Sequence, residues 1–259
     1  RNTDPSFSIE NIDMEDRQVF DMLCAGQTEG VFQFESAGMR SVLSQLKPES
    51  VEDLIAVISL YRPGPMDSIP TYIENRHNPA KIKYKTPKLK SILDVTYGCI
   101  VYQEQVMQIC RELAGYSYGR ADIVRRAMSK KKHDVMLRER DSFVNGTVDE
   151  NGNILCEGAV RRGVPAGVAN EIFDEMISFA SYAFNKAHAA AYAFVAYRTA
   201  WLKRHYPCEF LAALLTSFLD NSGKVAQYIN ECSRLGIKIL PPHVNRSTEA
   251  FEVSDGNIH

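Results

Sequence analysis

Two adjacent arginines followed by a lysine run are the strongest candidates for chemistry in this sequence. Arg125 and Arg126 precede Lys130, Lys131 and Lys132. Guanidinium groups bind phosphate oxygens through two parallel hydrogen bonds, and lysines add compact positive charge. The group is typical of a phosphate or triphosphate site. A solvated charge run near a helix C-terminus, which the helix dipole favours, explains the same residues equally well.

These cations are expected on a helix that is anchored by its opposite face. At 100° per residue, the apolar residues gather on one face, and Arg125 and Arg126 lie on the other with Asp122. The apolar residues are Ile123, Val124, Ala127 and Met128. We therefore expect these four side chains to pack inward and the guanidinium groups to point outward.

A second group of polar side chains is interleaved with alanines. Asn185, His188 and Tyr192 are spaced by three and four residues, so they share one face of a helix. The small alanines let a flat molecule approach, and these side chains can stack on a base or hydrogen-bond its edge. Close helix–helix packing, with Tyr192 in the core, is the other interpretation, and the residues alone favour it slightly.

Two further polar positions adjoin predicted helix ends. Arg62 begins Arg-Pro-Gly-Pro, which must end the preceding helix because prolines and glycine cannot continue it. Its guanidinium can bind an anion or cap carbonyls at that helix end, and the cap is slightly favoured. Glu104 lies in a polar cluster, residues 102–105, that opens the next long helix. The helix dipole alone explains a carboxylate there.

Several catalytic and metal-binding patterns are missing. The sequence has no Gly-x-x-x-x-Gly-Lys loop, no Gly-x-Gly-x-x-Gly, and no His-x-x-x-His or Cys-x-x-Cys spacing. It also lacks the Asp-x-Asp that could help to hold two metal ions. On its residues alone, the chain predicts a binding protein that holds no metal or cofactor, and not a self-sufficient enzyme.

Charge is distributed unevenly along the 259 residues. The net charge is −2, but residues 81–140 carry 14 basic and 6 acidic groups, a net +8. Such segregation predicts one surface that meets an anion. No run of apolar residues is long enough to span a membrane. Six scattered cysteines fit the reduced thiols of a cytoplasmic protein. The start of the chain has neither an initiator Met nor a signal-peptide core, so we expect a piece of a longer protein.

Helical periodicity dominates and predicts a mainly α fold with a few short strands or hairpins. Helices are expected within 16–46 (with breaks near 26 and 30) and over 51–60, 103–114, 121–144, 166–181, 184–219 (divided near 206–207) and 224–235. The remaining stretches are an irregular connector over 67–98 with a short helix near 69–76, a loop or hairpin over 145–165, an extended segment over 237–240 and a ragged end over 251–259.

Seven ordered motifs give the sequence a specific resemblance. They span residues 30–36, 60–65, 97–107, 121–132, 182–188, 206–210 and 238–242. On these motifs the chain resembles the fingers region of the alpha subunit of bacterial DNA polymerase III, a C-family replicative polymerase, over about 13–253. The resemblance implies a multi-helix fingers domain that closes over the nascent base pair and binds the incoming deoxynucleoside triphosphate during template-directed synthesis.

The resemblance also implies a domain division and site residues. Residues 1–12 would end the palm–fingers connection, 13–245 would form the fingers (with sub-regions 13–75, 76–145 and 146–245), and 246–259 would begin the following region. Carried over by position, the substrate-binding residues are Arg125, Arg126, Lys130, Lys132, Tyr182, Asn185, Lys186, His188, Tyr192 and Arg62. The resemblance suggests an auxiliary catalytic role for His188, as an acid or charge stabiliser for the leaving pyrophosphate, and a structural contact explains this residue about equally well. Ala187 and Ala189 replace two serines of the family pattern, which removes any contact those hydroxyls carry.

The implied enzyme is a DNA-directed DNA polymerase of the bacterial cytoplasm, a nucleotidyltransferase. This segment alone is expected to be inactive, because the aspartates that hold Mg²⁺ belong to the palm. The expected partners are the incoming nucleotide, primer–template DNA and the palm of the same chain, with the sliding clamp and other replisome subunits bound through other regions. The alternatives are a non-catalytic helical module that binds DNA or a protein partner through 81–140, and an inactive paralogue that keeps only the fold. Steep salt dependence without nucleotide preference would favour the helical module.

Overall fold

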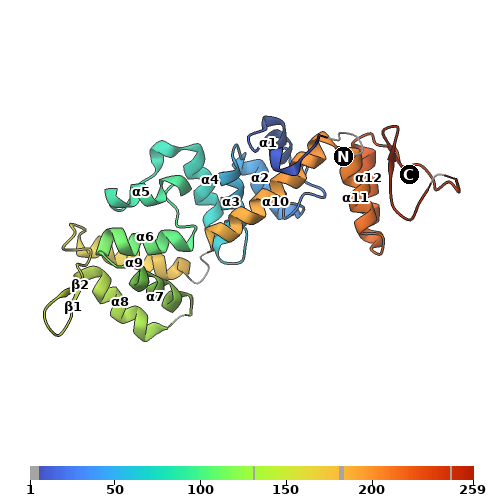
Figure 1. The fold of residues 1–259 in the computed structure, drawn as a ribbon. Helices are drawn as coiled ribbons and strands as arrows, with labels where there is room; N and C mark the ends of the chain where they lie inside the picture. The colour runs from blue at the N-terminus through green and yellow to red at the C-terminus, as the bar shows by residue number, and fades with distance from the viewer. Residues whose placement is uncertain (1–5, 131, 181–183, 246) are drawn as a thin grey trace. The chain divides into compact units, whose positions relative to one another are not determined.

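The computed structural model describes residues 6–130, 132–180, 184–245 and 247–259, with all their side chains except those of Met128, Ser129, His133 and Ala180. The described residues are mainly helical, with two small two-stranded hairpins (Figure 1). This confirms the predicted fold class. Within the same residues, no helix has the length and apolar character needed to cross a membrane.

The chain forms two compact units. The terminal unit combines Arg1–Leu54 with Ala191–His259, and the central unit is Ile55–Ala190. Two helices, α3 (Val51–Leu60) and α10 (Lys186–His205), carry the chain from one unit into the other. Every site residue from the arginine pair to His188 therefore belongs to the central unit.

The terminal unit is built from helices and a hairpin at its C-terminal end. Its elements are η1 (Ile9–Asn11), α1 (Arg17–Cys24), α2 (Ala37–Leu46), most of α10, α11 (Pro207–Ser217), α12 (Ser222–Arg234), β3 (Val253–Ser254) and β4 (Asn257–Ile258). The hairpin corrects the predicted ragged end. Its strand β4 bonds the extended segment before it, with Ile258 N donating to Lys238 O at 2.9 Å. The hairpin itself has a local signal, the Asp255-Gly256 turn between its strands, and only the bond to Lys238 spans twenty residues.

A buried ion pair crosses the terminal unit. Lys203 Nζ lies 2.7 Å from Glu231 Oε1, and these side chains are 1% and 2% exposed. The same ammonium donates to Glu29 O at 2.7 Å, and Arg234 Nε donates to Glu231 at 2.8 Å. Burial lowers the pKa of Lys203. Burial alone would raise the pKa of Glu231, but the bonds from Arg234 and Lys203 outweigh it and keep that pKa low.

The central unit contains the longer helices and the other hairpin. Its elements are η2 (Pro65–Ser68), α4 (Ile69–His77), η3 (Pro79–Lys81), η4 (Pro87–Leu89), α5 (Lys90–Leu93), η5 (Asp94–Thr96), α6 (Gln103–Ala114), α7 (Tyr118–Ser129), α8 (His133–Asn145), β1 (Thr147–Val148), β2 (Ile154–Cys156) and α9 (Ala166–Ala180). The connector over 67–98 is more helical than expected. Proline opens two of its short 3₁₀ turns, η3 and η4, a position where the missing N–H costs nothing.

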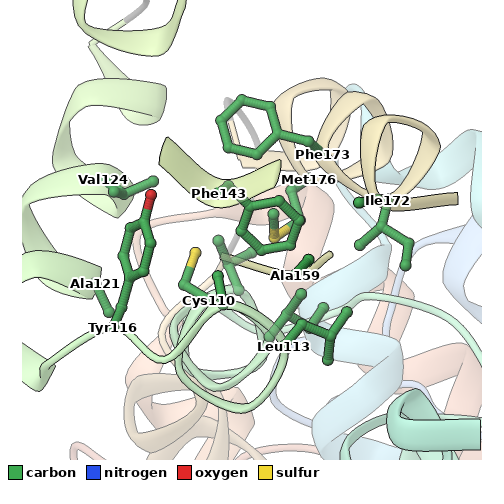
Figure 2. Close-up of a cluster of buried hydrophobic side chains, with 14 of the residues drawn as sticks. Cys110, Leu113, Tyr116, Ala121, Val124, Phe143, Ala159, Ile172, Phe173 and Met176 are labelled. Atoms are coloured by element: carbon green, nitrogen blue, oxygen red, sulfur yellow. The ribbon is translucent and has the colours of Figure 1, made fainter. Parts of the chain in front are cut away.

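The core of the central unit is formed by α6, α7, α8 and α9 (Figure 1). Phe143 of α8 is 0% exposed and lies among side chains of α6 and α9 (Figure 2). Its ring centroid is 5.4 Å from that of Phe173 and 6.5 Å from that of Tyr116. Burial raises the pKa of the Tyr116 phenol, whose hydroxyl donates to Glu139 Oε2 at 3.0 Å. The Tyr116 hydroxyl therefore has a hydrogen-bond partner at the edge of this core.

One predicted helix is wrong, because the stretch 121–144 forms two helices. Lys132 separates α7 from α8 with a non-helical ψ of 88°. Its N–H donates to Ala127 O at 3.1 Å, five residues back, which closes α7. The break lets Val124 of α7 and Phe143 of α8 enter one core. A single straight helix would point its apolar stripe along one line and could not fold back on the same core.

Candidate functional site

The arginine pair lies on α7 and shares one carboxylate. Arg125 Nε and Nη2 donate to Asp122 Oδ1 at 2.9 and 2.6 Å, and Arg126 Nη2 lies 2.6 Å from Asp122 Oδ2. The hydrogen bond from Arg125 is the main reason that the pKa of Asp122 falls below its ordinary value. The Arg125 side chain is 22% exposed and that of Arg126 is 67% exposed. Arg126 is therefore the more accessible of the two cations.

A small hollow beside Arg126 is also lined by two lysine residues. Its volume is about 210 Å³, and its lining residues are Ile123, Arg126, Ala127, Lys130, Lys132 and Val135. The prediction that Ile123 packs inward is wrong, because its side chain is 60% exposed, whereas Val124 and Ala127 are buried. Only the narrower stripe meets the core, so Ile123 stays beside the cations. The structure thus places Arg126, Lys130 and Lys132 around one concave surface.

The start of α6 meets the start of α10, about 80 residues later in the chain. Gln103 N donates to Phe184 O at 3.0 Å, and Tyr102 forms a parallel bridge with Phe184. The side chain of Gln105, which is 3% exposed, fixes the backbone just before α6. Its Oε1 accepts hydrogen bonds from Tyr102 N at 3.0 Å and from Val101 N at 2.8 Å. A buried amide thus holds the backbone that approaches Phe184.

Two site residues at the start of α10 bind Glu104. Asn185 Nδ2 donates to Glu104 Oε1 at 2.9 Å, and Lys186 N lies 3.2 Å from both carboxylate oxygens. Asn185 Oδ1 in turn accepts from His188 N at 2.8 Å. Asn185 therefore caps the first turn of α10 while Glu104 holds its amide. The Lys186 Nζ lies 5.1 Å from the centre of the Tyr102 ring, a cation–π distance.

The arginine pair is joined to this junction. Arg125 Nη1 donates to Gln103 Oε1 at 3.0 Å, so Gln103 binds α7 through its side chain and Phe184 through its backbone. Asp122 and Gln103 together bond Nε and both terminal nitrogens of the Arg125 guanidinium. Arg125 is thus held in place, whereas Arg126 pairs with Asp122 and has an exposed side chain.

Arg62 and His188 flank the same phenylalanine. The Arg62 guanidinium lies 4.1 Å from the centre of the Phe184 ring, and the His188 ring packs edge-on against Phe184 at 5.3 Å. Arg62 Nε donates to Ser59 O at 2.9 Å, which confirms the predicted cap at the helix end. Burial lowers the pKa of Arg62. Its role toward an anion stays a prediction.

Two predicted site residues, Tyr182 and Tyr192, have not yet been placed. Tyr182 lies outside the described residues. Tyr192 belongs to the terminal unit, where its ring packs on that of Phe32 with centroids 5.3 Å apart. Ala189 is 0% exposed, so this alanine serves close packing. The helix-packing interpretation therefore holds for part of the Asn185–Tyr192 stretch.

Sequence analysis gave Gln103 no role and explained Glu104 by the helix dipole alone. The structure shows that they bond Arg125, Asn185 and Lys186. The only signal in the sequence was a polar pair directly ahead of an apolar helix. That signal does not name a partner, because the partners lie 22 and about 80 residues away.

The arrangement can bind an anion and order a planar group beside it. Arg126, Lys130 and Lys132 supply positive charge, and Asn185 and His188 are exposed next to an aromatic ring. Among the described residues, no three histidine, cysteine or carboxylate side chains lie close enough to hold a metal ion. These cationic and polar side chains can contribute positive charge and hydrogen bonds that position a ligand.

Comparison with known proteins adds a family. Residues 1–151 match the family model of the bacterial DNA polymerase III alpha subunit finger domain. The chain is 46% identical over 250 residues to DNA polymerase III subunit alpha of Bacillus subtilis, with 96% of this chain and 21% of that protein aligned. It is also 46% identical over 258 residues to the Borreliella burgdorferi subunit, with 100% of this chain and 21% of that protein aligned.

The match to Staphylococcus aureus DNA polymerase III subunit alpha is of the same strength, 46% identity over 254 residues, covering 98% of this chain and 23% of that protein. The chain thus spans about a fifth of the length of the curated relatives it matches. Residues 1–151 include the arginine pair, Gln103 and Glu104.

Proposed function

The chain belongs to the finger-domain family of bacterial DNA polymerase III alpha subunits, and from that premise we propose that its central unit holds the incoming deoxynucleoside triphosphate against the nascent base pair. The polymerase to which it contributes is a DNA-directed DNA polymerase that acts in replication. We also propose that the fingers region extends over 13–245, beyond the residues matched by the family model. Its further partners are primer–template DNA and the palm of the same polymerase.

The observation that carries the proposal is the arginine pair forked on Asp122 beside a hollow lined by lysines. A carboxylate with two oxygens occupies the position that phosphate oxygens need, between two guanidinium groups. An incoming triphosphate brings more charge than Asp122, so it can draw Arg126 away from that carboxylate. Arg125 stays fixed by Gln103 meanwhile, which keeps the helix in place.

The residues around Phe184 supply the second part of the proposed site. Asn185 and His188 are exposed polar groups at the start of α10, and Lys186 lies over an aromatic ring. Bases and sugars offer a flat face and hydrogen-bonding edges to such groups. We assign this surface to the nucleoside end of the substrate and to the primer terminus.

Nucleotidyl transfer needs little covalent help from the protein, because positioning and charge stabilisation dominate. Arg126, with Arg125 behind it, would neutralise the charge that develops on the leaving pyrophosphate. Mg²⁺ activates the primer hydroxyl in such enzymes. The described residues do not fit a metal centre. We therefore assign Mg²⁺ to the palm aspartates and propose that this segment is inactive without them.

Changing Arg126 to alanine tests the phosphate assignment. We expect kcat/KM for single-nucleotide incorporation by the whole polymerase to fall roughly 10- to 150-fold, since a bond to a charged group contributes about 1.5–3 kcal/mol. The matched control is Arg138→Ala, which removes an exposed arginine from the neighbouring helix α8. If Arg126→Ala matches this control in incorporation but binds DNA with a weaker salt dependence, the basic surface serves the duplex and the assignment is wrong.

His188 provides a separate prediction about acid catalysis. If its imidazole protonates the leaving pyrophosphate, His188→Gln should lower the single-turnover rate and remove the corresponding limb of its pH profile. The measurement is incorporation across the pH range with saturating nucleotide. An unchanged rate and profile would show that His188 does not act as the acid.

A further inference from the structure

Glu104 lies where the two parts of the proposed site come together. Gln103 binds Arg125 of α7, and its neighbour Glu104 binds Asn185 and Lys186 of α10. Two consecutive residues at the first turn of α6 therefore hold both the phosphate end and the nucleoside end.

The bonds of Glu104 fix an orientation as well as a position. Its Oε1 accepts from the Asn185 amide at 2.9 Å, which turns the opposite end, Oδ1, toward His188 N at 2.8 Å. The carboxylate also lies 3.2 Å from Lys186 N, one of the first N–H groups of α10, which have no partner within the helix. An anion at a helix N-terminus is favoured by the helix dipole. One carboxylate thus sets the rotamer of Asn185 and the start of α10.

The burial of these groups argues against a role in stability alone. Glu104 is half-buried, and Asn185 and His188 are exposed. Hydrogen bonds at this level of exposure contribute little to folding, because water replaces them readily. The core beneath is held by other residues, among them the buried Gln105. The main effect of the Glu104 hydrogen bonds is to fix the orientation of Asn185 and the start of α10 at a polar surface.

We propose that Glu104 is a positioning residue for nucleotide binding, which registers Asn185 and Lys186 against the arginine helix. It touches no reacting atom and acts through Asn185. The proposal rests on the proposed function, because Glu104 can position Asn185 and Lys186 for a nucleotide only if a nucleotide binds at this surface. Loss of Glu104 leaves every group present but frees the Asn185 amide to rotate.

The test is steady-state and single-turnover incorporation by the whole polymerase with Glu104→Ala, Glu104→Gln, Asn185→Ala and the double variant. The matched control is Glu112→Ala, which removes an exposed carboxylate from the other end of α6. We expect Glu104→Ala to raise KM for the incoming nucleotide about tenfold, with kcat within about twofold. Glu104→Gln keeps one acceptor for the Asn185 amide and should recover part of that loss.

Two further readouts distinguish positioning from folding. Glu104→Ala and Asn185→Ala should be non-additive, because one acts through the other. The melting temperature and the affinity for primer–template should match those of Glu112→Ala. A KM equal to that of the control, additive effects, or a lowered melting temperature with a uniform loss of all activities would each overturn the proposal.

Arg126→Ala, measured alongside, separates the two claims. If Arg126→Ala incorporates nucleotide as efficiently as its control, the assignment of the phosphate site itself is wrong. An impaired Arg126→Ala together with a control-like Glu104→Ala overturns only the positioning role.

Discussion

Replacing Arg125 and Arg126 together by alanine should lower the efficiency of single-nucleotide incorporation by the whole polymerase by two orders of magnitude or more. Each charge-assisted contact to the triphosphate contributes about 1.5–3 kcal/mol, so the pair supplies about 3–6 kcal/mol of transition-state stabilisation. The double substitution should reduce incorporation efficiency more than Arg126→Ala alone does, because Arg125 also holds the helix through Asp122 and Gln103. The measurement is kcat/KM at fixed ionic strength.

The matched control for this experiment is Arg138→Ala with Arg161→Ala, two exposed arginines of the same unit. It removes the same charge without touching α7. Primer–template affinity should be equal in the two double variants. Near-normal incorporation with weakened DNA binding would instead show that the basic surface serves the duplex, and the assignment of the triphosphate would be wrong although the family would stand.

Phe143→Ala should destabilise the central unit by about 3–5 kcal/mol. The ring is fully buried against Phe173 and Tyr116, and its loss removes apolar contact and leaves a cavity that three helices cannot close. Amide hydrogen exchange in the whole polymerase measures this locally. The amides of α6, α8 and α9 should exchange roughly two to four orders of magnitude faster, since about 1.4 kcal/mol is a factor of ten.

Leu137→Ala provides the comparison, because Leu137 lies on the same helix and is 66% exposed. It should leave protection in these helices nearly unchanged. Equal exchange in the two variants would mean that α8 does not contribute to the core as described. The terminal unit serves as an internal reference, since its own core contains neither residue.

Much of the fold followed from local patterns. Helix α6 over Gln103–Ala114 and helix α3 over Val51–Leu60 have the predicted bounds, because apolar spacing and clear stop signals mark both. The hairpin over 147–156 lies inside the predicted loop or hairpin, and α10 and α11 divide at Tyr206 as Pro207 indicated. In each case the deciding interaction lies within a few residues of the chain.

The misses have local and tertiary causes. The bond that closes α7 joins Lys132 N to Ala127 O, and the C-terminal hairpin turns at Asp255-Gly256, so both have local signals that helical periodicity does not contain. Ile123 fits the apolar stripe of α7 by its spacing, but the neighbouring helices cover only Val124 and Ala127. The spacing of apolar residues shows which face of a helix is apolar, whereas the neighbouring elements decide how many residues of that face are buried.

The sequence by itself determined the helical class, the family motifs and the types of side chain available for binding phosphate, with Arg125 and Arg126 foremost. Only the tertiary structure decided which of them is the more accessible, by binding Arg125 to Gln103 and leaving the Arg126 side chain 67% exposed. It also decided that Glu104 holds Asn185, a partner 81 residues away. The physical reason is that helical propensity acts over a few residues, whereas register between helices is fixed by burial and hydrogen bonds after the chain has folded.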